Sequence, residues 1–205
     1  MFLQKSLRAQ ILALLGGSLA LILITALACF SFLSGGMQAY RGLLEGPLEA
    51  SRLIDSANVE FKIQVQEWKN VLLRGQDSDS LNKYWSQFEA QERKVQDILG
   101  ELAVLASDDA AMKSQVERLR SEHQTLGANY RKGRDAFVAA GGDSKAGDAA
   151  VKGIDRAASE QMSALVSQLH EQGLAQAKQI NAGAERTILL GSLVLLAASV
   201  VIALF

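Results

Sequence analysis

The sequence predicts an all-α protein: an antiparallel four-helix bundle of up-down-up-down order, anchored in a membrane by two flanking transmembrane helices. Three observations support this fold class. The chain carries a long uncharged run near each end, the segment between these runs repeats apolar residues every three or four positions, and no comparable window alternates with a period of two. Helical spacing without alternation favours α-helices over strands.

The two uncharged runs have the length of membrane spans. Ile11–Leu33 has 23 residues and contains no Asp, Glu, Lys, Arg, His, Asn or Gln. As a helix it reaches roughly 34 Å, enough for a hydrocarbon layer of about 30 Å. Thr187–Phe205 has 19 residues and reaches about 28 Å, which is barely sufficient. Between them lies a soluble segment, residues 34–186.

Charges beside the first run predict its orientation. Lys5 and Arg8 precede it, whereas no charge follows it before Arg41. Because positively charged flanks stay in the cytosol, we expect residues 1–10 to be cytoplasmic and residues 34–186 to be periplasmic.

A cleaved signal peptide is the alternative for the first run. Ala26-Leu27-Ala28 has the small-x-small form of a cleavage site, and Cys29 follows it directly, as in a weak lipoprotein signal. Apolar residues continue as far as Leu33, however, which makes the run longer than an ordinary signal sequence. The length therefore favours a retained span.

Three interruptions rich in Gly and helix-capping residues divide the soluble segment: residues 75–80, 107–109 and 141–147. We expect helices at Pro47–Arg74, Ser80–Ala106, Asp108–Ala140 and Asp148–Arg186. The connections are short, so neighbouring helices should be antiparallel.

The spacing of apolar residues and the position of the chain's one proline support these helices. The first stripe runs from Ile54 to Leu72 in steps of 3, 4, 4, 3 and 4 residues, which suits bundle packing. Gly46-Pro47 should kink or restart the first helix where it leaves the membrane. No proline lies between Ala149 and Phe205. We therefore expect one continuous helix from the bundle into the second span, able to transmit a displacement.

Charge and motif content exclude several classes of function. Lys5 and Arg8 are among the 21 Lys+Arg of the chain, which leaves 19 in the soluble segment against 22 Asp+Glu, a net charge of −3. This balance argues against nucleic acid and against anionic membrane surfaces as partners. No catalytic, phosphate-binding, haem-attachment or helical metal motif is present. We therefore expect no enzyme activity, no metal and no cofactor.

Counting residues from the loop centres suggests a ligand site in the membrane-distal third. Trp68 lies nine residues before Asp77 and Trp85 eight residues after it, so antiparallel helices place the two tryptophans at one level. Four cations fall near this level: Lys69, Arg74, Arg134 and Arg156. These six side chains could bind a small anionic ligand. The alternative is an aromatic core layer with cations extending to its rim.

The two histidines differ in position. His123 falls on the apolar stripe of the third helix, where it could bind a ligand or sense pH, but a hydrogen-bonded core histidine is the commoner case. His170 lies beside the stripe of the fourth helix, and we expect it to be solvated.

The segment Val59-Glu60-Phe61-Lys62-Ile63-Gln64-Val65-Gln66-Glu67-Trp68-Lys69-Asn70-Val71-Leu72-Leu73-Arg74-Gly75 resembles bacterial methyl-accepting chemotaxis receptors. Residues 64–75 are similar to a stretch near the end of the first sensor helix in many of them. The layout of two spans around a helical sensor is similar as well, although sensor histidine kinases share that layout.

The resemblance implies a two-pass homodimer in lipid of the bacterial inner membrane. Its periplasmic bundle would bind a small molecule or a periplasmic binding protein, and its last helix would carry the signal to a cytoplasmic part that contacts an adaptor protein and a histidine kinase. The chain stops at Phe205 without that part, so we expect a sensor fragment or a truncated receptor. The aspartate and serine receptors use a spaced arginine trio, and Lys62, Lys69 and Arg74 do not reproduce its spacing. Two alternative functions are the sensor region of a membrane histidine kinase and a helical scaffold without a switch.

Overall fold

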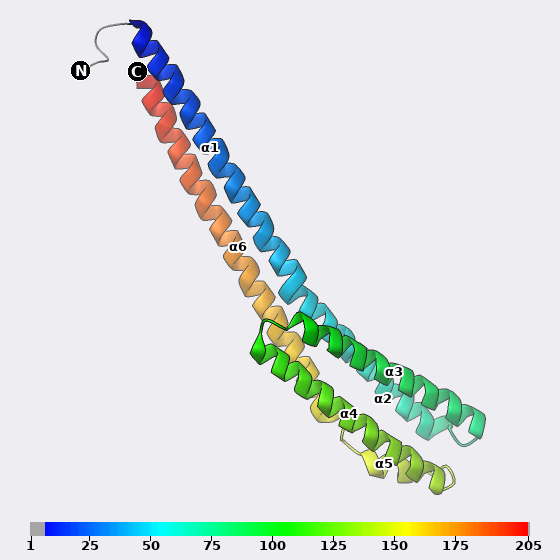
Figure 1. Ribbon diagram of the computed structural model, residues 1–205. Helices are drawn as coiled ribbons and strands as arrows, with labels where there is room; N and C mark the ends of the chain where they lie inside the picture. The colour runs from blue at the N-terminus through cyan, green and yellow to red at the C-terminus, as the bar shows by residue number, and fades with distance from the viewer. Residues whose placement is uncertain (1–6, 205) are drawn as a thin grey trace. The chain divides into compact units, whose positions relative to one another are not determined.

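The computed structural model describes residues 7–204, and all of its regular elements are helical (Figure 1). In chain order they are α1 (Leu7–Leu43), a π-helical turn (Leu44–Leu48), α2 (Glu49–Arg74), α3 (Ser78–Leu105), α4 (Ala110–Ala139), α5 (Ser144–Val151) and α6 (Arg156–Leu204). Within this described range there is no strand. The predicted all-α class is therefore confirmed.

The chain divides into two compact units. One unit combines the chain up to Leu44 with the chain from Leu174 onward, and the other is Glu45–Gly173. Two helical stretches, Arg8–Arg74 and Arg156–Ala197, are long and apolar enough to cross a membrane, and no residue in the most apolar window of either is buried. Within the first unit the Tyr40 hydroxyl is hydrogen-bonded to the side chain of Asn181.

The predicted spans fall inside these two helices. Ile11–Leu33 lies within α1, and the second run lies within α6 up to Leu204. Phe205 and residues 1–6, which belong to the expected cytoplasmic N-terminus, lie outside the described residues. Exposed apolar side chains such as Leu12, Leu19 and Phe30, each at least 70% exposed, are suited to contact with lipid.

A π-helical turn containing Pro47 separates α1 from α2. Proline has no N–H and its ring clashes with the carbonyl four residues earlier. The wider π turn accommodates that clash. The irregularity expected at Gly46-Pro47 is therefore present, although α2 begins at Glu49.

Aspartate side chains cap the N-termini of three helices in the second unit. Asp77 accepts a hydrogen bond from the backbone of Ser80, Asp109 accepts from Ala111 and Met112, and Asp143 accepts from Lys145. Each bond satisfies a backbone N–H that has no partner inside its own helix. The caps place the loops close to the predicted interruptions.

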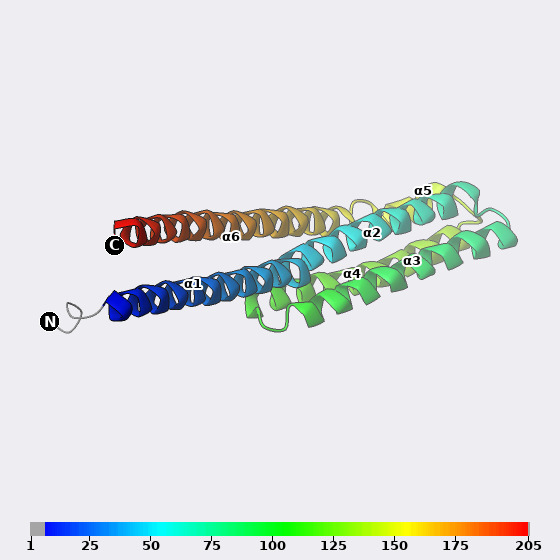
Figure 2. The ribbon, with the colours of Figure 1, turned by 90° about the horizontal axis from the view of Figure 1, so that it is seen from above.

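The second unit has one hydrophobic core, to which α2, α3, α4, α5 and the beginning of α6 contribute. Figures 1 and 2 show α2 and α3 running side by side along this unit. The α6 residues in this core are Ala158, Met162, Leu165 and Leu169. Their spacing of three to four residues gives α6 one buried stripe. The up-down-up-down bundle order remains a prediction.

The fourth predicted helix is wrong in its first part. The structure has α5 from Ser144 to Val151 and starts α6 only at Arg156, so a single helix from Asp148 does not form. The predicted interruption at residues 141–147 is also too long, because Gly147 is buried inside α5. From Arg156 to Leu204 the helix is continuous.

Backbone angles explain the break. Lys152 has φ −57° and ψ 114°, Gly153 has φ +75°, and the Ile154 N–H donates to the Val151 carbonyl at 3.3 Å. Such angles and this hydrogen bond are those of a type II turn, which needs glycine at its third position. Gly153 therefore ends one helix where the apolar spacing continues.

Candidate functional site

Four aromatic side chains from α2, α3 and α4 form a buried cluster, called here the aromatic cluster: Trp68, Trp85, Phe88 and Tyr130. Trp68 contacts Tyr130 with ring centroids 5.3 Å apart, and Phe88 contacts Tyr130 at 5.0 Å. Trp85 stacks on Phe88 at 4.8 Å with the rings inclined by 13°. The two tryptophans are thus joined through Phe88 and Tyr130, at the common level that residue counting predicts.

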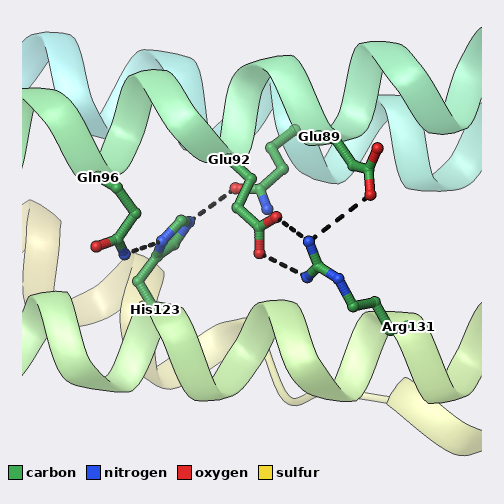
Figure 3. A network of polar contacts seen from close by, with 6 residues as sticks. Glu89, Glu92, Gln96, His123 and Arg131 are labelled. Atoms are coloured by element: carbon green, nitrogen blue, oxygen red, sulfur yellow. Dashed lines mark hydrogen bonds and ion pairs between the residues drawn. The ribbon is translucent and has the colours of Figure 1, made fainter.

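Two guanidinium groups of α4 lie over Trp85. Arg134 is 5.0 Å from the ring centroid and Arg131 is 5.9 Å away. Arg131 also donates two hydrogen bonds, of 2.9 and 2.6 Å, to the carboxylate of Glu92, and lies 3.8 Å from Glu89 (Figure 3). The hydrogen bonds to Glu92 raise the pKa of Arg131. The charge of Arg131 is therefore neutralised within the protein.

Arg134 differs from Arg131 because no carboxylate compensates its charge. Its side chain is half-buried, and its Nε is buried without a hydrogen-bond partner. Within residues 7–204 it forms no ion pair. A half-buried cation over an aromatic face, with one donor unused, is suited to binding an anion.

The other predicted site residues do not join Arg134 in one contact group. Lys69 lines a shallow depression between the end of α2 and α5, together with Lys145 and Asp148. The Arg74 guanidinium lies 5.8 Å from the Tyr84 ring centroid, and its Nη1 is 3.5 Å from the Tyr84 hydroxyl.

Arg156 is the first residue of α6 and is exposed. No contact of its side chain with the aromatic cluster is seen in the described part of the chain. The structure thus brings Trp68, Trp85 and Arg134 into one assembly, and within residues 7–204 no contact of Lys69, Arg74 or Arg156 with the cation and rings of this assembly is seen.

Sequence reasoning missed Tyr130, Phe88 and Arg131 as members of this assembly. Tyr130 and Phe88 both lie on the apolar stripes of their helices, so the signal for them was present in the spacing. Arg131 lies three residues before Arg134, on an adjoining part of the α4 surface. Its pairing with Glu92 of another helix has no signal in the sequence.

Three polar side chains lie together in the same core and are called here the amide–histidine layer: Gln64, Gln96 and His123. Gln64 and His123 are both fully buried. His123 Nε2 is 2.8 Å from Gln64 Oε1, and His123 Nδ1 is 2.7 Å from Gln96 Nε2 (Figure 3). Burial lowers the pKa of His123 to about 4, although Glu92 acts in the opposite direction. His123 is therefore a hydrogen-bonded core residue that is neutral near pH 7.

Neither group has the composition of a metal site. Among residues 7–204, no three His, Cys, Asp or Glu side chains gather in a way that could hold a metal ion. His123 has both ring nitrogens occupied by amides, so it has no free position for a ligand. The assembly around Trp85 and Arg134 is suited to recognising a small anion.

Comparisons with known proteins give one curated relative. The chain is 58% identical over 202 residues to the methyl-accepting chemotaxis protein CtpH of Pseudomonas aeruginosa. The match covers 98% of this chain and 35% of the relative, so the chain spans about a third of the relative's length. No protein-family model matches the chain, and no solved structure matches it. The relationship to methyl-accepting chemotaxis receptors that the sequence predicts is confirmed by this relative.

Proposed function

From the relationship to a methyl-accepting chemotaxis protein, we propose that this chain is the sensor region of a bacterial chemoreceptor. It is held in the inner membrane by α1 and α6, with its N-terminus in the cytoplasm and residues 34–186 in the periplasm as a four-helix bundle. Two observations support this: the 58% identity to the receptor CtpH, and the two helical stretches with the length and composition of membrane spans.

The sensor detects a small anionic ligand at the assembly of Trp68, Trp85 and Arg134. The observation that carries this assignment is the uncompensated charge of Arg134. Its guanidinium lies 5.0 Å from the centroid of the Trp85 ring, and its buried Nε has no partner. A ligand carboxylate or similar group would compensate this charge, and its charge-assisted hydrogen bond to the guanidinium would be stronger than a neutral one. Lys69, Arg74 and Arg156 add positive charge around the site.

Signalling proceeds through α6, which runs unbroken from Arg156 to Leu204. In a whole receptor, a homodimer of such chains would pass the change to a cytoplasmic part that contacts an adaptor protein and a histidine kinase. Ala177→Pro would place a kink in α6, because proline removes a helical hydrogen bond. We expect that variant, in a receptor with its cytoplasmic part, to bind ligand normally but to lose the response. An unchanged response would contradict transmission through α6.

A thermal-shift screen of the 205-residue chain in detergent tests the ligand site. The compounds are amino acids, organic acids and nitrogenous metabolites. A ligand at 100 times its dissociation constant stabilises the native state by about 2.7 kcal/mol. We expect Arg134→Gln to lose this stabilisation, whereas Arg118→Gln, an exposed change on the same helix, keeps it. Stabilisation that is unchanged in Arg134→Gln would contradict the site, and no stabilisation by any compound would favour a scaffold without a switch.

A further inference from the structure

The short helix α5 is fixed to α2 and α4 by glycines that leave no room for a side chain. A Cβ on Gly147 would lie 2.6 Å from Leu72 Cδ2 and 3.0 Å from Phe137 Cβ. A Cβ on Gly133 would lie 2.8 Å from Val151 Cγ1 and 3.1 Å from Trp68 Cη2. Backbones in such close approach cannot slide without clashes. Helix α5 therefore belongs to the same rigid part as Trp68.

The connection from α5 to α6, in contrast, is a turn without such close packing at its glycine. This connection contains the type II turn Val151–Ile154, which depends on Gly153, whose φ is +75°. Apart from its chain neighbours, no atom lies within 4 Å of a Cβ built on Gly153, so the turn is open at this glycine, while the next residue, Ile154, packs against the core. Helix α6 begins at Arg156, and its first buried contact with the core is Ala158. The chain thus changes from a tightly packed helix to an open turn at Gly153.

The aromatic cluster belongs to the fixed side of this connection. The Tyr130 ring of α4 packs on both Trp68 and Phe88. Trp68 in turn lies against Gly133, where α4 approaches Val151 of α5. The rings beside Arg134 are therefore part of the unit formed by α2, α4 and α5.

We propose that the connection Lys152–Asp155 is a joint, at which α6 moves against a fixed unit of α2, α4 and α5. This inference rests on the proposed function, which gives the movement of α6 its role in signalling. A continuous helix would transmit a change at the cluster only by moving α5 as well. The turn lets α6 respond while α5 stays in place, because a few loop residues absorb the change in backbone angles.

Distance measurements between pairs of spin labels test the joint without any ligand. The 205-residue chain with Cys29→Ser is placed in lipid nanodiscs and labelled at exposed positions. Ala150→Cys with Gln168→Cys reports the separation of α5 from α6, and Ala150→Cys with Glu117→Cys reports that of α5 from α4. Gly153→Ala disfavours the turn and adds no clash. Gly141→Ala is the matched control, since Gly141 has φ +67° and is equally free of neighbours.

We expect Gly153→Ala to shift the α5–α6 distance by about 1–2 Å, the size of helix movements in known switches. The α4–α5 distance should stay the same, and Gly141→Ala should leave the α5–α6 distance unchanged. An α5–α6 distance that is unaffected by Gly153→Ala, or that changes together with the α4–α5 distance, would overturn the joint. Because no ligand is used, this result is independent of the thermal-shift screen.

Discussion

The side-chain amide of Gln96 lies 2.7 Å from Nδ1 of His123 and defines the state of that buried ring. The amide nitrogen is a donor, so Nδ1 accepts and the ring proton resides on Nε2, which donates to Gln64 Oε1. Gln96 Nε2 also donates to the Arg120 carbonyl at 3.1 Å. Protonation of Nδ1 would place two donors face to face and break the hydrogen bond between Gln96 and His123.

The first prediction follows from this protonation state. The pKa of His123 is about 4 when folded, against 6.5 ordinarily, so the unfolded chain binds more protons between these values and stability falls as the pH is lowered. Stability is fully present above pH 6.5, and about 3 kcal/mol is lost by pH 4. Thermal unfolding of the 205-residue chain at a series of pH values should show a flatter acid slope for His123→Gln. The control, His170→Gln, changes an exposed histidine and should retain the normal slope; equal slopes in all three proteins would contradict the assignment.

The second prediction concerns the close approach of α4 and α5. Gly133→Ala would push a methyl group against Val151 and the Trp68 ring, and we expect a loss of about 1–3 kcal/mol of unfolding free energy from overpacking. Gly100→Ala is the matched change within α3, where the nearest atom is 3.7 Å away on the flexible Arg120 side chain. It should stabilise the protein by about 0.5–1 kcal/mol through helix propensity. Thermal melts showing the same sign for both variants would exclude this packing.

A third prediction tests the cap of α4. Asp109 accepts from two backbone N–H groups, those of Ala111 and Met112, each at 3.0 Å. Asp109→Ala should therefore cost about 1 kcal/mol of stability. Its neighbour Asp108 caps no helix in the described structure, and Asp108→Ala should have a smaller effect. Unfolding measurements in which the two variants were equally stable would show that Asp109 is not the cap.

The fourth prediction concerns the pair of Arg131 and Glu92. A double-mutant cycle with Arg131→Ala and Glu92→Ala should give a coupling energy of about 1 kcal/mol, the upper range for such pairs. Its two hydrogen bonds and the 13% exposure of the Glu92 side chain favour this value. A cycle on Glu49 and Arg52, which are both more exposed, should give less. A larger coupling there would mean that burial does not strengthen the first pair.

Much of the fold could be predicted because the local signals agree with each other. Apolar steps of three and four residues marked the core stripes of α2, α3 and α4, and Asp77 and Asp109 stand at helix starts that they cap. The α5–α6 turn could not be seen in the same way. Val151, Ile154 and Ala158 keep the helical spacing across it, and a lone glycine such as Gly153 is tolerated in many helices.

The sequence predicted the level of the candidate site residues along their helices. It did not predict which way each side chain faces around its helix axis. Residue counting placed Trp68, Trp85 and Arg134 at one level, and the structure brings these three together. Which cations face each other depends on helix rotation, and a sequence of one chain does not specify that angle. For this reason Arg131 was missed, and Arg74 contacts Tyr84 instead of a tryptophan.

The amide–histidine layer has a consequence for the response to ionic strength. Its three members are uncharged near pH 7 and are joined by hydrogen bonds that are shielded from water. Mobile ions screen interactions between exposed charges within about 10 Å at 0.1 M salt, and they act far less on groups in the interior. A rise in salt concentration would weaken the exposed ion pairs of the second unit and leave the alignment of α2, α3 and α4 at Gln64, Gln96 and His123 intact.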